Sequence, residues 1–313
     1  MSGRHNTPSQ AGSRKRCFAA AIAKLGLGTA QFGLDYGVSN TRGRLSEAEA
    51  RATLAVAAEG GLRLIDTAAQ YGDAETALGR ALPASDGFEG GGFRVVTKTA
   101  SLALGLAAVE LQARASLVRM GIARADALLV HQAADLAGPD GPALWTLLRR
   151  LKDEGLFQAI GISAYASDDP VALARRFAPD IMQLPVSLLD QRLIENGALA
   201  ELAGLGVEVH LRSIFLQGLL FLPRAGLPGR LAACGPRLSR IQRMIAEAGA
   251  DPLQAALAFA LNRPEASAAI VGVASAAELR AILAAAAAPT PSLDWAALSL
   301  DDPLALDPRA WAA

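Results

Sequence analysis

The feature that most constrains the fold is a repeat of short apolar runs, each of which ends on a polar or ionisable residue. The runs that end at Asp66, Lys98, His131 and Ser163 follow one another at separations of 32, 33 and 32 residues. A (β/α)₈ barrel of typical size uses about 30 residues per strand–helix unit, and its chemistry lies at the C-terminal ends of its strands. The repeat therefore predicts a barrel whose strand ends form an active-site floor.

Further apolar runs bring the number of predicted strands to eight. We expect them at residues 24–29, 62–66, 93–98, 127–131, 157–163, 181–184, 207–213 and 269–273. Strands that alternate with helices predict a parallel sheet, and with eight of them closure into a (β/α)₈ TIM barrel is the simplest arrangement. The alternative is an open doubly wound sheet. It is disfavoured because Gly26-Leu-Gly28 lacks the third glycine of the G-x-G-x-x-G motif.

Two helix starts have recognisable caps. Ser46, followed by Glu49 three residues later, has the pattern of a capping box. Ser275 precedes the last predicted helix in the same way and is expected to cap it.

Composition excludes several classes of protein. The chain has 313 residues, of which 52% are hydrophobic, and its 30 Lys and Arg equal its 30 Asp and Glu. Without a basic excess, neither nucleic acid nor an anionic membrane is an expected partner. Cys17 and Cys234 are too few for a disulfide framework or a zinc site, so no metal is expected. No run approaches the about 20 apolar residues of a membrane span.

The N-terminal segment has two interpretations. Basic residues 14–16 precede a short apolar stretch, as in a signal peptide, but Lys24 interrupts that stretch. The favoured interpretation is a disordered tail over residues 1–22 that leads into a single barrel domain over residues 23–313. On this interpretation we expect a cytoplasmic protein.

Asp66, Lys98, His131 and the nearby Tyr71 suggest one proton-transfer chemistry. Each alone has an ordinary explanation, such as an ion pair or a buried imidazole, but their conjunction on one rim is harder to dismiss. A phenol holds its proton tightly near neutrality, and an adjacent ammonium such as that of Lys98 stabilises the phenolate. Asp66 can keep the ammonium charged, and His131 can orient a carbonyl oxygen. This is half of a carbonyl reduction; the hydride requires a cofactor.

These residues also match a known family. Asp66-Thr67-Ala68-x-x-Tyr71-Gly72, Thr97-Lys98 and Val130-His131 resemble the aldo/keto reductases, which are (β/α)₈ barrels that use NADP(H) or NAD(H). The resemblance covers the chain from Leu25 to about Ala285. It implies that Tyr71 is the general acid/base, that Lys98 and Asp66 tune it, and that His131 positions the carbonyl.

The resemblance further implies a set of cofactor contacts. Gly28, Thr29 and Ala30 would border the nicotinamide ribose, and Ser163 and Gln183 would bind the carboxamide. Ser213, Phe215, Gln217 and Gly218 match the pyrophosphate segment, while Gly272 and Ser275 match the adenosine side, where a helix N-terminus offers amides to phosphate.

Three positions depart from the family pattern. Arg212 stands where an aromatic residue usually stacks on the nicotinamide. Its guanidinium can stack as well, or it can reach an anionic substrate or the cofactor phosphates, or turn to solvent or a nearby carboxylate. Ala164 replaces a usual Asn. Around the expected 2′-phosphate pocket, Ala274 and Ile282 replace a basic residue and an Asn, and Glu278 replaces a neutral amide. An acidic group there favours a free 2′-hydroxyl, so these residues indicate NAD(H) or dual use.

The sequence thus predicts an oxidoreductase that interconverts an aldehyde or ketone, including sugar-derived ones, with the alcohol. Two alternatives stay open. One is a regulatory subunit that senses the nicotinamide cofactor without turnover, against which the intact tetrad argues. The other is a dehydrogenase that works in the oxidative direction, for instance on a sugar hydroxyl.

Overall fold

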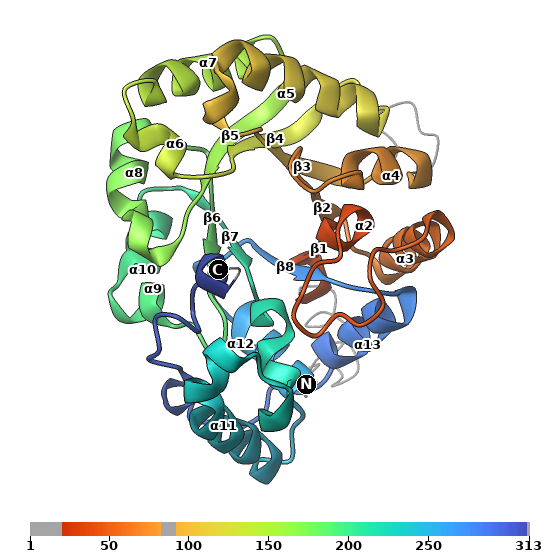
Figure 1. The fold of residues 1–313 in the computed structure, drawn as a ribbon, viewed down its shortest axis with the longest axis vertical. Helices are drawn as coiled ribbons and strands as arrows, with labels where there is room; N and C mark the ends of the chain where they lie inside the picture. The colour runs from red at the N-terminus through yellow and green to blue at the C-terminus, as the bar shows by residue number, and fades with distance from the viewer. Residues whose placement is uncertain (1–20, 83–91, 312–313) are drawn as a thin grey trace, which may run out of the picture.

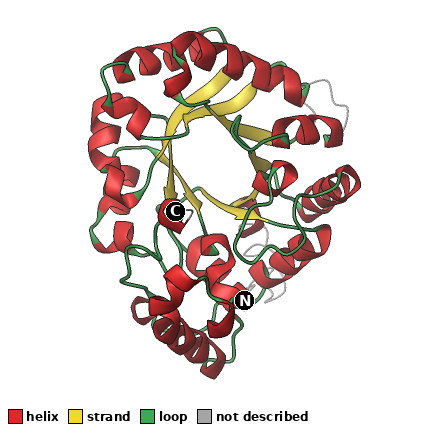
Figure 2. Ribbon diagram, in the orientation of Figure 1, coloured by secondary structure: helices red, strands yellow, loops and turns green. Residues whose placement is uncertain are grey.

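The computed structural model describes residues 21–82 and 92–311, and within them parallel strands close into a barrel in sequence order (Figures 1 and 2). β1 pairs with both β2 and β8, which closes the ring. The strands are β1 (Leu25–Gly28), β2 (Leu64–Asp66), β3 (Arg94–Lys98), β4 (Ala125–Val130), β5 (Phe157–Ser163), β6 (Ile181–Pro185), β7 (Glu208–Arg212) and β8 (Ala268–Gly272). The eight predicted strands and the barrel are confirmed, and the open-sheet alternative is excluded.

Helices surround the barrel, as Figure 2 shows. The longer ones are α3 (Glu47–Gly60), α4 (Ala74–Ala81), α5 (Leu106–Met120), α7 (Gly141–Asp153), α8 (Pro170–Phe177), α10 (Ala198–Gly204), α11 (Gly235–Glu247), α12 (Pro252–Leu261) and α13 (Ala276–Ala286). Short helical turns occupy the loops: α2 (Ala30–Gly33), η1 (Leu102–Leu104), α6 (Ala134–Ala137), η2 (Ala166–Asp168), α9 (Arg192–Glu195), η3 (Leu216–Phe221), η4 (Arg224–Gly226), η5 (Gly229–Cys234), η6 (Ala296–Leu298) and η7 (Pro308–Trp311).

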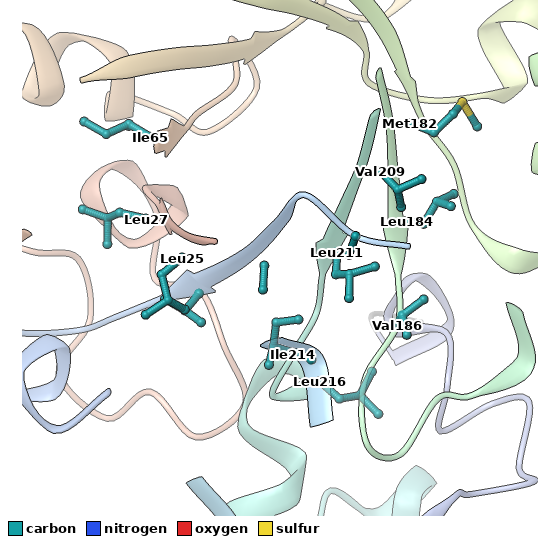
Figure 3. Packing of buried hydrophobic residues seen from close by; sticks show 14 of the residues in the cluster. Leu25, Leu27, Ile65, Met182, Leu184, Val186, Val209, Leu211, Ile214 and Leu216 are labelled. Atoms are coloured by element: carbon teal, nitrogen blue, oxygen red, sulfur yellow. The ribbon is translucent and has the colours of Figure 1, made fainter. Parts of the chain in front are cut away.

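Successive strand residues point to opposite faces of the sheet, and this alternation divides the apolar residues into two layers. The inner layer consists of strand residues alone: Leu64, Val96, Ala127, Leu129, Ile181, Ala268 and Ile270. The outer layer joins the other strand positions to the helices, and Figure 3 shows part of it, including Leu25, Leu27, Ile65, Met182, Leu184, Val209 and Leu211. The inner layer is crowded, because a Cβ at Gly161 would lie 2.3 Å from the carbonyl oxygen of Ile181.

The same alternation places polar residues inside the barrel at its C-terminal end. Asp66, Lys98, His131 and Gln183 each follow an inner-layer residue by two positions. Ser163 follows the inward Gly161 in the same way, and Arg212 ends β7 one residue after the outward Leu211. Because side chains alternate with a period of two along each strand, the predicted site residues lie together at the C-terminal end of the barrel interior.

One of the two predicted helix caps forms as expected and the other only in part. Ser275 Oγ accepts a hydrogen bond from the Glu278 amide at 3.1 Å. Ser46 Oγ likewise accepts from the Glu49 amide at 3.2 Å, but the Glu49 carboxylate does not return to Ser46. It accepts instead from the Ala276 amide of α13 at 2.6 Å, so the predicted capping box is wrong. The reason is that α13 packs against α3 and presents unpaired amides to that carboxylate.

The predicted tail falls almost entirely outside the described residues, as do Cys17 and most of the loop expected between α4 and β3. The boundary at residue 22 is wrong, because Ile22 is buried in the core with 3% of its surface exposed. Cys234 is buried with a free thiol. Among the described helices, none is long and apolar enough to span a membrane.

Candidate active site

Lys98 lies at the centre of the candidate site, at the end of β3. Its Nζ donates to Asp66 Oδ1 at 2.5 Å, to the backbone oxygen of Thr67 at 3.0 Å and to the Tyr71 hydroxyl at 3.5 Å. The Lys98 and Asp66 side chains are only 1% and 5% exposed. Three residues of the predicted tetrad are therefore in direct contact.

The charge of Lys98 survives in this buried place. Burial opposes the ammonium, but the carboxylate of Asp66 and the oxygen of Tyr71 outweigh it, so the pKa of Lys98 is raised above its usual range. The second oxygen of Asp66 accepts from Gln183 Nε2 at 2.6 Å. Asp66 on β2 is thus held by side chains from both β3 and β6, which orients it toward Lys98.

Local packing positions the Tyr71 hydroxyl. Tyr71 lies in the loop between β2 and α4, and α2 packs closely against this loop, since a Cβ at Gly33 would stand 1.8 Å from the Tyr71 carbonyl oxygen. Gly72 follows with φ of +55°, a left-handed value that favours glycine. The Tyr71 ring then lies at the cavity floor with Lys98 Nζ 5.1 Å from its centroid.

His131 is the fourth member of the tetrad and lies directly after β4. Its ring meets the Tyr71 ring edge-on, with centroids 5.6 Å apart and planes at 82°. Burial, together with the positive charges of Lys98 and Arg212, lowers the pKa of His131 to about 3. The imidazole is therefore neutral at physiological pH. Its Nδ1 is buried without a hydrogen-bond partner among the described residues, and a neutral imidazole has one N–H to donate.

A cavity of about 940 Å³ opens above the tetrad. Tyr71, His131 and Asp66 line it, while Lys98 lies beneath. Most of the residues predicted to bind the cofactor also line this cavity: Gly28, Ala30, Ser163, Gln183, Arg212, Ser213, Phe215, Gln217, Gly218, Gly272 and Glu278. Thr29 and Ser275 are not part of the lining. Thr29 Oγ1 donates to the Asp66 carbonyl oxygen at 3.1 Å, and Ser275 Oγ caps α13.

The lining fits a dinucleotide better than a small substrate alone. About 940 Å³ lies at the upper end of the range of small-molecule and cofactor sites. Gly28 and Gly272 are partners in the β1–β8 register and leave part of the floor without side chains. After β7, Ser213, Leu216 and Gln217 have positive φ of 59°, 46° and 54°. Such backbone strain in non-glycine residues is concentrated at functional sites.

At the far end of the cavity, the N-terminal amides of α13 already have partners. The Ala274 amide donates to Glu278 Oε2 at 2.7 Å, and the Ala276 amide donates to Glu49 Oε1 at 2.6 Å. A helix N-terminus attracts anions, and here two carboxylates of the chain itself take that place.

Several cavity residues lay outside the sequence prediction, among them Tyr36, Tyr165 and Arg309. Tyr36 follows β1 and Tyr165 follows β5, so a search for aromatic residues in the loops at strand C-termini would have found both. Arg309 offered no such signal. It reaches the site from the C-terminal segment, 142 positions from Ser167, to whose hydroxyl it donates at 3.1 Å.

Comparison with known proteins agrees with this geometry. The model of the aldo/keto reductase family matches residues 24–299, so the chain belongs to that family. It is 40% identical over 153 residues to an aldo-keto reductase of Mycolicibacterium vanbaalenii, covering 48% of this chain and 53% of that protein. An aldo-keto reductase of Mycobacterium sp. (strain MCS) is 41% identical over 128 residues, covering 40% and 44%. The chain thus spans about half the length of the curated relatives it matches.

Solved structures show the same fold. An aldo-keto reductase from Bacillus halodurans in its holo form has a TM-score of 0.68 at 20% identity, over 86% of this chain and 88% of that one. A putative aldo-keto reductase from Pseudomonas aeruginosa has a TM-score of 0.60 at 24% identity, over 84% and 90%.

Proposed function

We propose that the protein is a nicotinamide-dependent oxidoreductase that interconverts an aldehyde or ketone with the corresponding alcohol. The observation that carries the proposal is the buried chain of contacts from Asp66 through Lys98 to the Tyr71 hydroxyl, at the floor of a cavity large enough for a dinucleotide. Family membership supports the same chemistry.

Each tetrad residue has one task in this reaction. When bound, the nicotinamide supplies or accepts the hydride. The Tyr71 hydroxyl gives its proton to the substrate oxygen in reduction and takes it back in oxidation. Lys98, which Asp66 keeps charged, stabilises the negative charge left on the Tyr71 oxygen. His131 donates its one N–H to the substrate oxygen, and because the ring is neutral it adds no second cation beside Lys98.

We further infer a preference for NAD(H) over NADP(H). A 2′-phosphate at the N-terminus of α13 would have to displace the carboxylates of Glu278 and Glu49 from the amides of Ala274 and Ala276. It would also meet the negative charge of Glu278, which lines the cavity. A free ribose 2′-hydroxyl can instead donate a hydrogen bond to a carboxylate.

The test of the proposed reaction is Tyr71→Phe, assayed with 4-nitrobenzaldehyde at the nicotinamide absorbance. We expect kcat to fall by about 10²- to 10⁴-fold, the range for loss of a general acid. Cofactor affinity, measured by fluorescence titration, should stay within threefold of wild type. Tyr36→Phe is the matched control, because it deletes a hydroxyl from the same cavity without touching Lys98. Undiminished turnover in Tyr71→Phe would remove Tyr71 from the mechanism.

The same assay separates an enzyme from a cofactor-sensing subunit. A protein that binds the nicotinamide cofactor tightly but turns over neither aldehydes nor alcohols would favour the regulatory alternative.

A further inference from the structure

Three arginines line the cavity: Arg309 has a counterion, Arg42 is exposed to solvent, and the half-buried Arg212 has no counterion among the described residues. Among the ionisable side chains that line it, Asp66 is paired with Lys98, Asp168 lies 3.6 Å from an Arg309 nitrogen, and Glu278 accepts from a backbone amide. Arg212 forms no ion pair with any described carboxylate. Charged side chains that lose access to water are usually paired, whereas Arg212 has a buried Nε without a described partner and lies on the same floor as the tetrad.

The Arg212 guanidinium is held in place with much of its bonding capacity unused. Its Cζ lies 4.1 Å from the centroid of the Tyr165 ring. One terminal nitrogen donates to the Ala164 carbonyl oxygen at 3.2 Å and the other to Ser213 Oγ at 3.3 Å. A guanidinium has five N–H donors. The Nε of Arg212 is buried and has no partner among the described residues. The sequence-based possibility that Arg212 turns to solvent is therefore excluded.

The Tyr165 ring, on which Arg212 stacks, is itself held by a residue of the C-terminal segment. The Cζ of Arg309, in η7, lies 3.7 Å from the centroid of the same Tyr165 ring. Unlike Arg212, Arg309 is compensated, because it forms three hydrogen bonds to Asp307 at 2.9, 3.2 and 2.6 Å. Arg309 thus holds the ring, and Arg212 retains the uncompensated charge.

We propose that Arg212 binds the carboxylate of the substrate, so that the enzyme acts on carbonyl compounds carrying a carboxylate group. This rests on the proposed oxidoreductase function. A planar guanidinium with free N–H groups matches a carboxylate in geometry. On the cavity floor the one uncompensated cation among the described residues, Arg212, balances a single negative charge, which favours a carboxylate over a phosphate dianion. The positive charge of Arg212 acts on His131 as well, so the anion site adjoins the place where the carbonyl oxygen is bound.

The test compares two aldehydes that differ in the charge of one group and by the methyl that neutralises it. 4-Carboxybenzaldehyde and its neutral methyl ester, methyl 4-formylbenzoate, are assayed with NADH under identical conditions. In the wild type we expect kcat/KM to be at least tenfold higher for the acid, mainly through a lower KM. Arg212→Gln should bring the ratio of the two kcat/KM values close to one, and Arg212→Lys should give an intermediate ratio. Arg175→Gln is the control, since Arg175 pairs with Glu201 and does not line the cavity.

The outcomes separate this inference from the function on which it rests. If the wild type reduces neither aldehyde, the proposed oxidoreductase function fails. If it reduces both with equal kcat/KM, that function stands and the carboxylate site is refuted. Fluorescence titration of NADH supplies a second readout. If Arg212→Gln weakens NADH binding more than tenfold and leaves the ratio unchanged, Arg212 belongs to the cofactor site and the inference is wrong.

Discussion

Replacement of Lys98 by methionine tests the buried ion pair as both a structural and a chemical element. Methionine keeps the length and the apolar stem of lysine but removes the ammonium. Asp66 would then retain the hydrogen bond from Gln183 and lose its cation, in a place where its side chain is 5% exposed. Removing one partner of a buried pair costs about 3–5 kcal/mol, because the other charge is left uncompensated.

The magnitude can be measured by thermal and urea unfolding. At about 2 °C per kcal/mol for a domain of this size, Lys98→Met should lower Tm by about 6–10 °C. The double variant Asp66→Asn, Lys98→Met removes both charges and keeps the side-chain volumes, so it should recover most of that loss. An equal loss of stability in the single and double variants would show that the ion pair is not the cause.

Activity should behave differently from stability. Both variants lack the ammonium 3.5 Å from the Tyr71 hydroxyl, so both should lose at least about 10²-fold in kcat. The double role of Lys98 is refuted if Lys98→Met unfolds at the wild-type urea midpoint, or if the double variant regains turnover. If the double variant regains stability but not turnover, Lys98 contributes to the chemistry as well as to the fold.

The remaining predictions concern the cofactor and pH. In fluorescence titration the Kd for NADH should be at least as low as that for NADPH. Glu278→Gln should lower the Kd for NADPH relative to that for NADH, because it removes the charge that faces a 2′-phosphate. Tenfold tighter NADPH binding by the wild type would contradict this preference. Burial and then the charges of Lys98 and Arg212 hold the pKa of His131 at about 3, against about 6.5 in an unfolded chain. Only the unfolded state therefore takes up this proton as pH falls below 6.5. Between pH 7 and 5 the wild type should lose about 2 kcal/mol more unfolding free energy than His131→Asn, and equal losses in urea titrations would show that His131 is not held neutral.

The grouping of several site residues follows from the local pattern of apolar and polar residues in the sequence. An apolar run with alternating side chains ends on Asp66, on Lys98 and on His131, and parallel strands deliver their C-terminal ends to the same rim. Nothing more than strand direction and a period of two is needed to bring such residues together. For this reason the sequence predicted both the barrel and the grouping of the tetrad, although strand ends differed by one or two residues.

Other features depended on contacts that no local pattern encodes. The sequence pattern predicts that Glu49 forms half of a capping box with Ser46. Its carboxylate instead accepts a hydrogen bond from the amide of Ala276, 227 positions away, because α3 and α13 pack side by side. The sequence left several roles open for Arg212, and its stacking on Tyr165 became visible only with β5, β7 and η7 in place.

The amino-acid sequence by itself determined the succession of strands and helices, the inward residues at the strand ends, and hence the grouping of Asp66, Lys98 and His131. Tertiary structure alone decided which carboxylates occupy the N-terminus of α13 and left Arg212 on the cavity floor without a counterion among the described residues. Strand periodicity and strand direction are properties of neighbouring residues, whereas the partner of a long charged side chain depends on which surfaces the packed barrel brings within a few ångströms.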